Sequence, residues 1–164
     1  MRRSIRTLVT LAAATAATAV VMGAPASAST STDPQPLVAG PAVESWGSYY
    51  SSNFKARANG TVRVNWNGAE TSNNVQVRGR LYDLDFRTLA QGGKCAFVQV
   101  KVHHLYQPNW KWDNAPSHKL CDAGSVKHFA FWNHNVDKVR IRVSQVGKYS
   151  DYAIRKGAWH QVNI

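Results

Sequence analysis

The sequence predicts an all-β fold: a small antiparallel β-sandwich of six to eight strands, with an extended N-terminal arm and one disulfide. From Trp46 onward, short runs of alternating apolar and polar residues are separated by Gly, Pro, Asn and Ser, and no stretch keeps a helical period. Cys95 and Cys121 form an even pair without any C-x-x-C spacing, which favours a bridge worth roughly 3 kcal/mol over a metal site. Two packed sheets bury one face of each strand, and a small barrel is the alternative.

Residues 1–28 have the three parts of a secretory signal peptide. Three arginines lie among the first six residues, residues 7–23 are apolar or small, and residues 26–28 read Ala-Ser-Ala, an A-x-A cleavage site. The apolar stretch is short and is followed by polar residues, which favours secretion into the extracellular medium over membrane insertion. The mature chain is therefore expected to begin at Ser29.

Residues 29–45 differ in composition from the rest of the chain and are predicted to form an extended Pro/Ser-rich arm, ahead of a sandwich domain over 46–164. Prolines and Gly40 disfavour a helix or a central strand in this segment. An extended arm can dock in a partner's groove or add a strand to a partner's sheet, and a passive leader is the alternative. The residues predicted to bind a partner here are Pro36, Leu37, Val38, Ala39, Pro41 and Val43.

Residues 53–66 contain an Asn-Gly pair and are predicted to form a hairpin. A three-residue turn over 58–60 pairs apolar residues with each other, such as Ala56 with Val62. It also gives Gly60 the left-handed bulge position, whereas a two-residue turn would mix the two faces.

Three further segments, 74–84, 95–104 and 138–146, alternate cleanly and are predicted to be strands. Their inward residues are Val75, Val77, Leu81, Ala96, Val98, Val100, Val102, Val139, Ile141 and Val143. Their outward residues are Arg78, Arg80, Tyr82, Gln99, Lys101, His103, Arg140 and Arg142.

The remaining segments are less regular. Residues 105–120 contain two prolines and several asparagines and are predicted to be a loop or an irregular edge. Residues 126–132 and the segment near 158–164 are predicted to be strands. Antiparallel pairing follows, because no helical crossover is available to join parallel strands.

The chain is strongly basic, with a formal net charge of +11, which falls to +8 when the three arginines of the signal segment are removed. A net positive charge on an exported protein favours anionic partners, such as acidic proteins or an anionic wall polymer, although such a charge also increases solubility. Cations on exposed strands can also discourage edge-to-edge aggregation. The predicted basic surface consists of Lys55, Arg57, Arg63, Arg78, Arg80, Lys101, Arg140 and Arg142.

Aromatic residues gather in the irregular loop. Trp110 and Trp112 are two positions apart and would share one side of an extended segment, with Tyr106 nearby. Large rigid rings of this kind serve protein contacts or stack on sugars, so all three are predicted partner-binding residues. Packing of the rings on the sandwich edge is the alternative.

No motif in the sequence indicates catalysis. The chain has no G-x-S-x-G motif, and its histidines lack H-x-H or H-x-x-x-H spacing. Asp83 and Asp85 lie at one strand end on one face, which fits no specific reaction. We therefore expect no enzyme activity, no metal and no cofactor; a small hydrolase or ribonuclease toxin using His with Lys or Arg is the alternative.

Several segments resemble the small exported β-sandwich proteins of actinobacteria. These are the Ala-rich signal, the Pro/Ser leader, VQVRGRLYDLD at 75–85, GGKCAFVQV at 92–100, a second cysteine about 25 residues later, and VRIRV at 139–143. Within that set the chain is similar to the small adaptor subunit of the umbrella toxin particles of streptomycetes. The resemblance implies a non-enzymatic connector between a lectin-bearing subunit and a toxin subunit, docked in part by its N-terminal segment.

The sequence therefore predicts a secreted protein–protein interaction module, with other secreted proteins as partners. A binding module for a wall polyanion or a carbohydrate is the alternative. Nucleic acid is not an expected partner, and no membrane insertion is expected.

Overall fold

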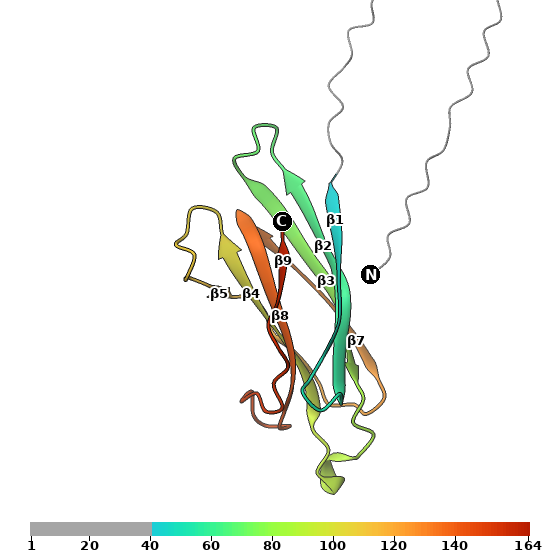
Figure 1. Cartoon of the computed structure of the whole chain (residues 1–164). Coiled ribbons are helices and arrows are strands. Elements are labelled where there is room, and N and C mark those ends of the chain that lie inside the picture. The colour runs from blue at the N-terminus through green and yellow to red at the C-terminus, as the bar shows by residue number, and fades with distance from the viewer. Residues whose placement is uncertain (1–40) are drawn as a thin grey trace, which may run out of the picture. The chain divides into compact units, whose positions relative to one another are not determined.

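The computed structural model describes residues 41–164, and their alternating side chains produce two antiparallel sheets packed face to face (Figure 1). The fold is therefore all-β, as predicted. The signal segment and the predicted arm residues Pro36, Leu37, Val38 and Ala39 lie outside the described residues. No helix in the described part of the chain is long and apolar enough to cross a membrane.

Sheet A has the strand order β1-β2-β3-β7, and every neighbouring pair is antiparallel. Its central pair, β2 with β3, is in register along its whole length, from Ala56 opposite Asp83 to Trp66 opposite Asn73. The strands are β1 (Ala42–Tyr50), β2 (Ala56–Trp66), β3 (Asn73–Asp83) and β7 (Val126–His134).

Sheet B has the order β5-β4-β8-β9, and the short β6 also pairs with β4. Two of the nine strands have only two or three residues, β5 and β6, and both lie in the segment predicted to be irregular. The strands are β4 (Cys95–His104), β5 (Asp113–Asn114), β6 (His118–Leu120), β8 (Val136–Val146) and β9 (His160–Asn163), and one 3₁₀ turn, η1 (Leu89–Gln91), precedes β4.

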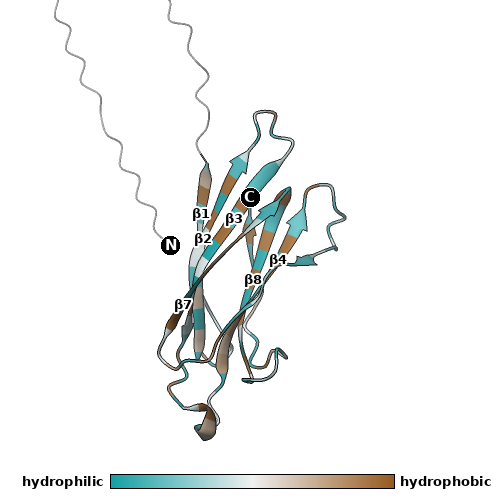
Figure 2. Ribbon diagram, turned by 180° about the vertical axis from the view of Figure 1, so that it is seen from behind, coloured by the Kyte–Doolittle hydropathy of each residue, from teal (hydrophilic) through white to brown (hydrophobic). Residues whose placement is uncertain are grey.

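The core lies between the sheets, where the alternating hydrophobic positions of both sheets meet (Figure 2). Every residue predicted to face inward from 74–84, 95–104 and 138–146 is buried, so the predicted facing of these strands is confirmed. A row of rings adds to this core on sheet A. The Trp46 and Phe129 rings lie 6.3 Å apart, over the backbone of Gly60 and Gly79.

The predicted hairpin over 53–66 is wrong. The Asn59-Gly60 pair lies in the middle of β2, which continues through it without a turn. The alternation Ala56, Ala58, Gly60, Val62 is unbroken on the inner face. Gly60 is needed there because a Cβ atom would lie 2.6 Å from the Trp46 ring and 1.9 Å from the carbonyl oxygen of Arg78.

The C-terminal part of the predicted arm is also different from expectation. Residues 42–45 belong to β1, which pairs with β2 from Ala42 opposite Val64 onward. The buried Trp46 ring fixes this strand on sheet A, while Pro41 and Val43 are exposed.

A third difference concerns His103, which was predicted to point outward. His103 is buried, and its ring forms hydrogen bonds with Asp137 and with the Pro108 carbonyl oxygen.

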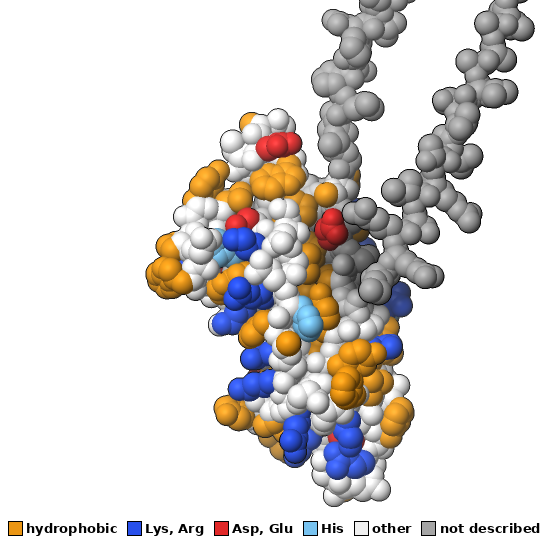
Figure 3. Space-filling model, viewed as in Figure 1, with side chains coloured by type: hydrophobic (Ala, Val, Ile, Leu, Met, Phe, Trp, Pro, Cys, Tyr) orange, Lys and Arg blue, Asp and Glu red, His pale blue; other side chains and the backbone are white. Residues whose placement is uncertain are grey.

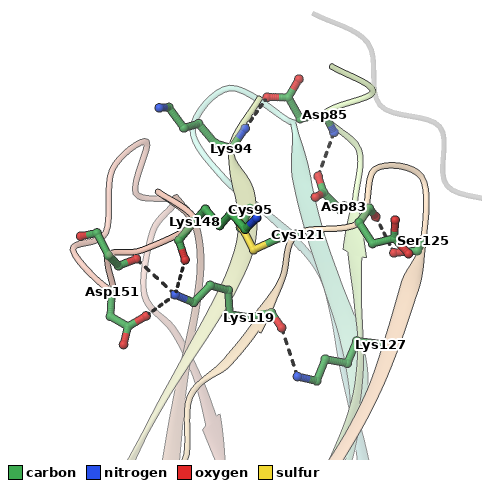
Figure 4. Close-up of a disulfide and its surroundings, with 12 residues drawn as sticks. Asp83, Asp85, Lys94, Cys95, Lys119, Cys121, Ser125, Lys127, Lys148 and Asp151 are labelled. Atoms are coloured by element: carbon green, nitrogen blue, oxygen red, sulfur yellow. Dashed lines mark hydrogen bonds and ion pairs between the residues drawn. A yellow bond between two sulfur atoms is a disulfide. The ribbon is translucent and has the colours of Figure 1, made fainter. Parts of the chain in front are cut away.

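The predicted disulfide between Cys95 and Cys121 is present and joins the start of β4 to the residue after β6 (Figure 4). It lies in a second small hydrophobic cluster with Phe97, Val146 and Ala153. No cysteine of the chain is free. The bridge therefore holds the irregular β5–β6 segment against the sheet that it borders.

Candidate functional site

Four arginines face outward from sheet A because they alternate with the buried positions of β2 and β3. The register places each one opposite an uncharged residue: Arg63 faces Gln76, Thr61 faces Arg78, Asn59 faces Arg80 and Arg57 faces Tyr82. Like charges are thus never directly opposite across this strand pair, which avoids the largest part of their repulsion. We call Arg57, Arg63, Arg78 and Arg80 the arginine face.

The arginine face has no internal counter-charge. None of the ion pairs among residues 41–164 includes any of these four guanidinium groups. The one carboxylate of β1, Glu44, sits opposite Val62, a residue of the inner face. Arg63, Arg78 and Arg80 are exposed, so their charges are available to an external partner.

A groove of about 850 Å³ lies within the arginine face. Gly60 and Gly79, neighbours across β2 and β3, contribute backbone to its lining, and the space left by their missing side chains is filled from the core side by the Trp46 and Phe129 rings. Its polar lining residues are Ser48, Asn59, Thr61, Arg78, Arg80 and His128, and Trp46, Gly47, Phe129 and Ala130 complete the lining. The groove can therefore accept an inserted side chain while guanidinium groups contact its anionic neighbours.

Beside the groove, the Arg57 guanidinium lies 4.1 Å from the centroid of the Tyr82 ring. Burial acts to raise the pKa of the Tyr82 hydroxyl, but hydrogen bonding and positive charge from Arg80 and Arg57 outweigh it and lower that pKa. Buried Arg57 Nε has no hydrogen-bond partner among the described residues. Val43 of β1 and Trp132 of β7 add exposed apolar surface on the same face.

Three cations of sheet B, Lys101, Arg140 and Arg142, are arranged differently, because each lies against an aromatic ring. The Arg140 guanidinium is 4.0 Å from the Trp112 ring centroid, and the Arg142 guanidinium is 4.4 Å from that of Trp159. Lys101 Nζ lies 5.6 Å from the same Trp159 ring. The guanidinium groups also donate to amide oxygens, Arg142 to Gln99 at 2.7 Å and Arg140 to Gln161 at 3.2 Å. These groups are engaged within the fold, unlike those of the arginine face.

The aromatic residues of the irregular loop do not form one surface. Tyr106 and Trp110 are exposed, whereas Trp112 is half-buried beneath Arg140 and beside His103. Both ring nitrogens of His103 face acceptors, Asp137 Oδ1 at 2.6 Å and the Pro108 carbonyl oxygen at 3.1 Å. His103 thereby holds the loop to sheet B, a structural role.

Asp83 and Asp85 form a buried polar cluster at the end of β3. Asp85 pairs with Arg87 at 2.8 Å and with Lys55 at 3.4 Å, so the predicted surface cation Lys55 is used within the fold. Hydrogen bonding from Arg87 lowers the pKa of Asp85, whereas burial raises the pKa of Asp83 to about 6. No cluster of three or more metal-ligating side chains occurs among residues 41–164.

Compared with known proteins, the chain matches no protein family, no curated sequence and no solved structure. The arguments about function therefore rest on its own residues. Sequence reasoning identified the four arginines of the arginine face but missed the groove that Arg78 and Arg80 line and its further lining residue His128. Gly79, a glycine inside an alternating strand, does signal the close approach of another group, which is the Phe129 ring on the core side.

Proposed function

We propose that this chain is an exported, non-enzymatic protein–protein interaction module that binds an acidic segment of a partner protein on the arginine face. The observation that supports the proposal most directly is a face of four arginines that have no carboxylate partner among residues 41–164, two of which, Arg78 and Arg80, line a groove. Guanidinium groups form paired hydrogen bonds with carboxylates, which gives both affinity and orientation.

The composition of the face favours a protein over a polymer as the partner. Arginine and tryptophan are enriched among the residues that contribute most to protein interfaces, and here Trp132 lies beside the arginines. A local groove suits one inserted side chain of a partner, whereas a polymer requires repeated contacts along a stripe. Unpaired positive charge also speeds encounter with an acidic partner.

Export is supported by the signal-like segment 1–28 and by the Cys95–Cys121 disulfide, since such bridges persist outside the cytosol. The resemblance to umbrella toxin adaptors gives one specific form of the function: a connector between toxin and lectin subunits. The predicted arm residues Pro36, Leu37, Val38, Ala39 and Pro41 would then add contacts of their own.

Binding of an anionic wall polymer is the second candidate, because cations occupy both sheets. Binding of inorganic polyphosphate, used as a probe, would then fall steeply with salt, as each contact releases counterions. A protein partner held by a few guanidinium–carboxylate pairs in a groove shows a shallower salt dependence.

The test is affinity purification of the tagged chain from Ser29 onward, incubated with culture supernatant and analysed by mass spectrometry. We expect stoichiometric recovery of a secreted protein, and we expect Arg80→Ala to weaken its binding by about 2 kcal/mol, roughly thirtyfold. Lys111→Ala, which removes one exposed cation elsewhere, is the matched control. Equal loss in both variants, or no recovered partner, would contradict the proposal.

A further inference from the structure

A different surface, at the end of the sandwich where β1, β3 and β8 finish, presents four large exposed side chains. Phe54 is 70 % exposed, Phe86 77 %, Tyr149 91 % and Tyr152 73 %. They come from three separate loops, those that follow β1, β3 and β8. We call this surface the aromatic end. Single exposed apolar residues are ordinary, so it is the location of all four at one end of the sandwich that suggests a partner.

The loops of the aromatic end are tied together rather than independent. The backbone N–H of Ser52 donates to the Arg155 carbonyl oxygen at 3.1 Å, which joins the first loop to the third. The buried Asp85 carboxylate binds Lys55 from the first loop and Arg87 from the second. The four rings are therefore presented as a group from a common base.

The charge of the aromatic end is positive. Its four loops contain six Lys or Arg and three Asp, and the Asp85 carboxylate is neutralised within the fold. Lysines lie beside the rings, with Lys148 Nζ and Lys156 Nζ each 5.2 Å from the centroids of Tyr149 and Tyr152 respectively. Figure 3 shows Lys and Arg side chains together with hydrophobic ones at the lower end of the molecule. The four loops of the aromatic end are residues 51–55, 84–94, 121–125 and 147–158.

The backbone of this end also departs from ordinary geometry. Phe54 and Arg155 adopt φ angles of 59° and 49°, a region that favours glycine or asparagine. The chain nevertheless places a large ring and a cation at these two positions. Glu70 and Tyr106 at the opposite end share this conformation, so the exposed rings and the charge, and not the backbone, distinguish the aromatic end.

We propose that the aromatic end docks onto the surface of an anionic lipid bilayer. Aromatic rings with one polar edge settle at the level of the lipid headgroups, and lysines and arginines are attracted to anionic lipids beneath them. A bilayer accepts rings from separate loops without matching pockets. The opposite end also exposes Tyr106 and Trp110, but there Lys111 and Lys138 are offset by Glu70, Asp113 and Asp137, so it lacks the positive charge for this partner.

The proposal does not depend on the arginine face, and its test uses a different readout. The chain from Ser29 onward, which contains every described strand, is sedimented with vesicles of phosphatidylglycerol and phosphatidylcholine, or of phosphatidylcholine alone. We expect binding to the anionic vesicles. The double variant Tyr149→Ser/Tyr152→Ser is expected to lower the partition coefficient about tenfold, and Lys148→Gln about fivefold.

Matched controls remove the same groups from the opposite end. Tyr106→Ser/Trp110→Ser and Lys111→Gln take away exposed rings or one exposed cation, and we expect both to bind anionic vesicles like the parent chain. Circular dichroism checks that each variant is folded, which is expected since all six substituted side chains are exposed. The proposal is overturned by absent binding, by equal binding to neutral vesicles, or by equal losses in the control variants.

Discussion

Asp83 gives the most specific prediction about stability, because the residue is only 2 % exposed and the pKa of its carboxyl group is raised from 3.8 to about 6. Burial is the main cause, reinforced by the charges of Asp85 and Asp122 and opposed by backbone N–H groups of Asp85 and Ala96. Between these two pKa values the folded chain keeps a proton that the unfolded chain has lost. Asp83 therefore stabilises the fold fully below about pH 4, and this contribution is lost as the pH rises through 6.

The magnitude follows from the shift of roughly two pH units, about 3 kcal/mol at 1.36 kcal/mol per unit. Asp83→Asn removes the charge and keeps one oxygen for the Asp85 N–H, which Asp83 accepts at 3.1 Å (Figure 4). Loss of the second carboxylate oxygen costs about 1 kcal/mol. We expect the variant to be less stable than the parent at pH 4 and more stable by 1–2 kcal/mol, roughly, at pH 8.

Urea unfolding of both chains at five pH values from 4 to 8 measures this difference directly. Asp85 titrates in the opposite sense, because its lowered pKa stabilises the fold above about pH 4 and loses that effect in acid. Asp85 keeps its ion pairs with Arg87 and Lys55 in both chains, so the comparison isolates the removal of the Asp83 charge together with its interaction with Asp85. A difference in unfolding free energy that stays constant with pH would refute the reasoning.

Two further predictions concern the core and its crosslink. Replacing Cys95 and Cys121 by Ser removes a bridge between residues 26 positions apart and should cost about 3.5 kcal/mol in chemical unfolding, whereas an unchanged midpoint would contradict this. Gly79→Ala places a Cβ atom 2.3 Å from the Phe129 ring and should cost about 1–3 kcal/mol. Gly68→Ala meets no atom within 4 Å and is the control; similar losses in both would argue against the close contact.

The strands that the sequence predicted best are those whose pattern is decided by burial alone. In 95–104 and 138–146, β-branched residues alternate with polar ones, and no turn residue interrupts them. His103 is an exception. Alternation predicts which face of the sheet a residue occupies, but it does not predict hydrogen bonds to Asp137 and Pro108, which lie outside the strand pattern itself.

The hairpin was wrong because a local signal competed with a tertiary one. Asn59-Gly60 is a strong turn pair, yet Gly60 is present for the Trp46 ring that lies over it. The alternation across 56–64 favoured one continuous strand and was the better guide. β1 was missed for a related reason: its pairing depends on the burial of Trp46, while Gly40 and Pro41 just before it argued against a strand.

The candidate site was only partly predictable for a geometric reason. Outward facing of Arg63, Arg78 and Arg80 follows from alternation, but their grouping on one sheet depends on strand order, which a single sequence does not fix. The same strand order separates them from Arg140 and Arg142, whose guanidinium groups are used within the fold.

The most direct test of the central claim is arginine-specific dicarbonyl labelling of the chain, alone and with the partner recovered from culture supernatant, read by peptide mass spectrometry. The account predicts that Arg63, Arg78 and Arg80 become protected in the complex while the exposed Arg155, at the aromatic end, stays labelled. Unchanged labelling of the first three arginines, with protection of Arg155 or Arg140 instead, would show that the partner binds elsewhere.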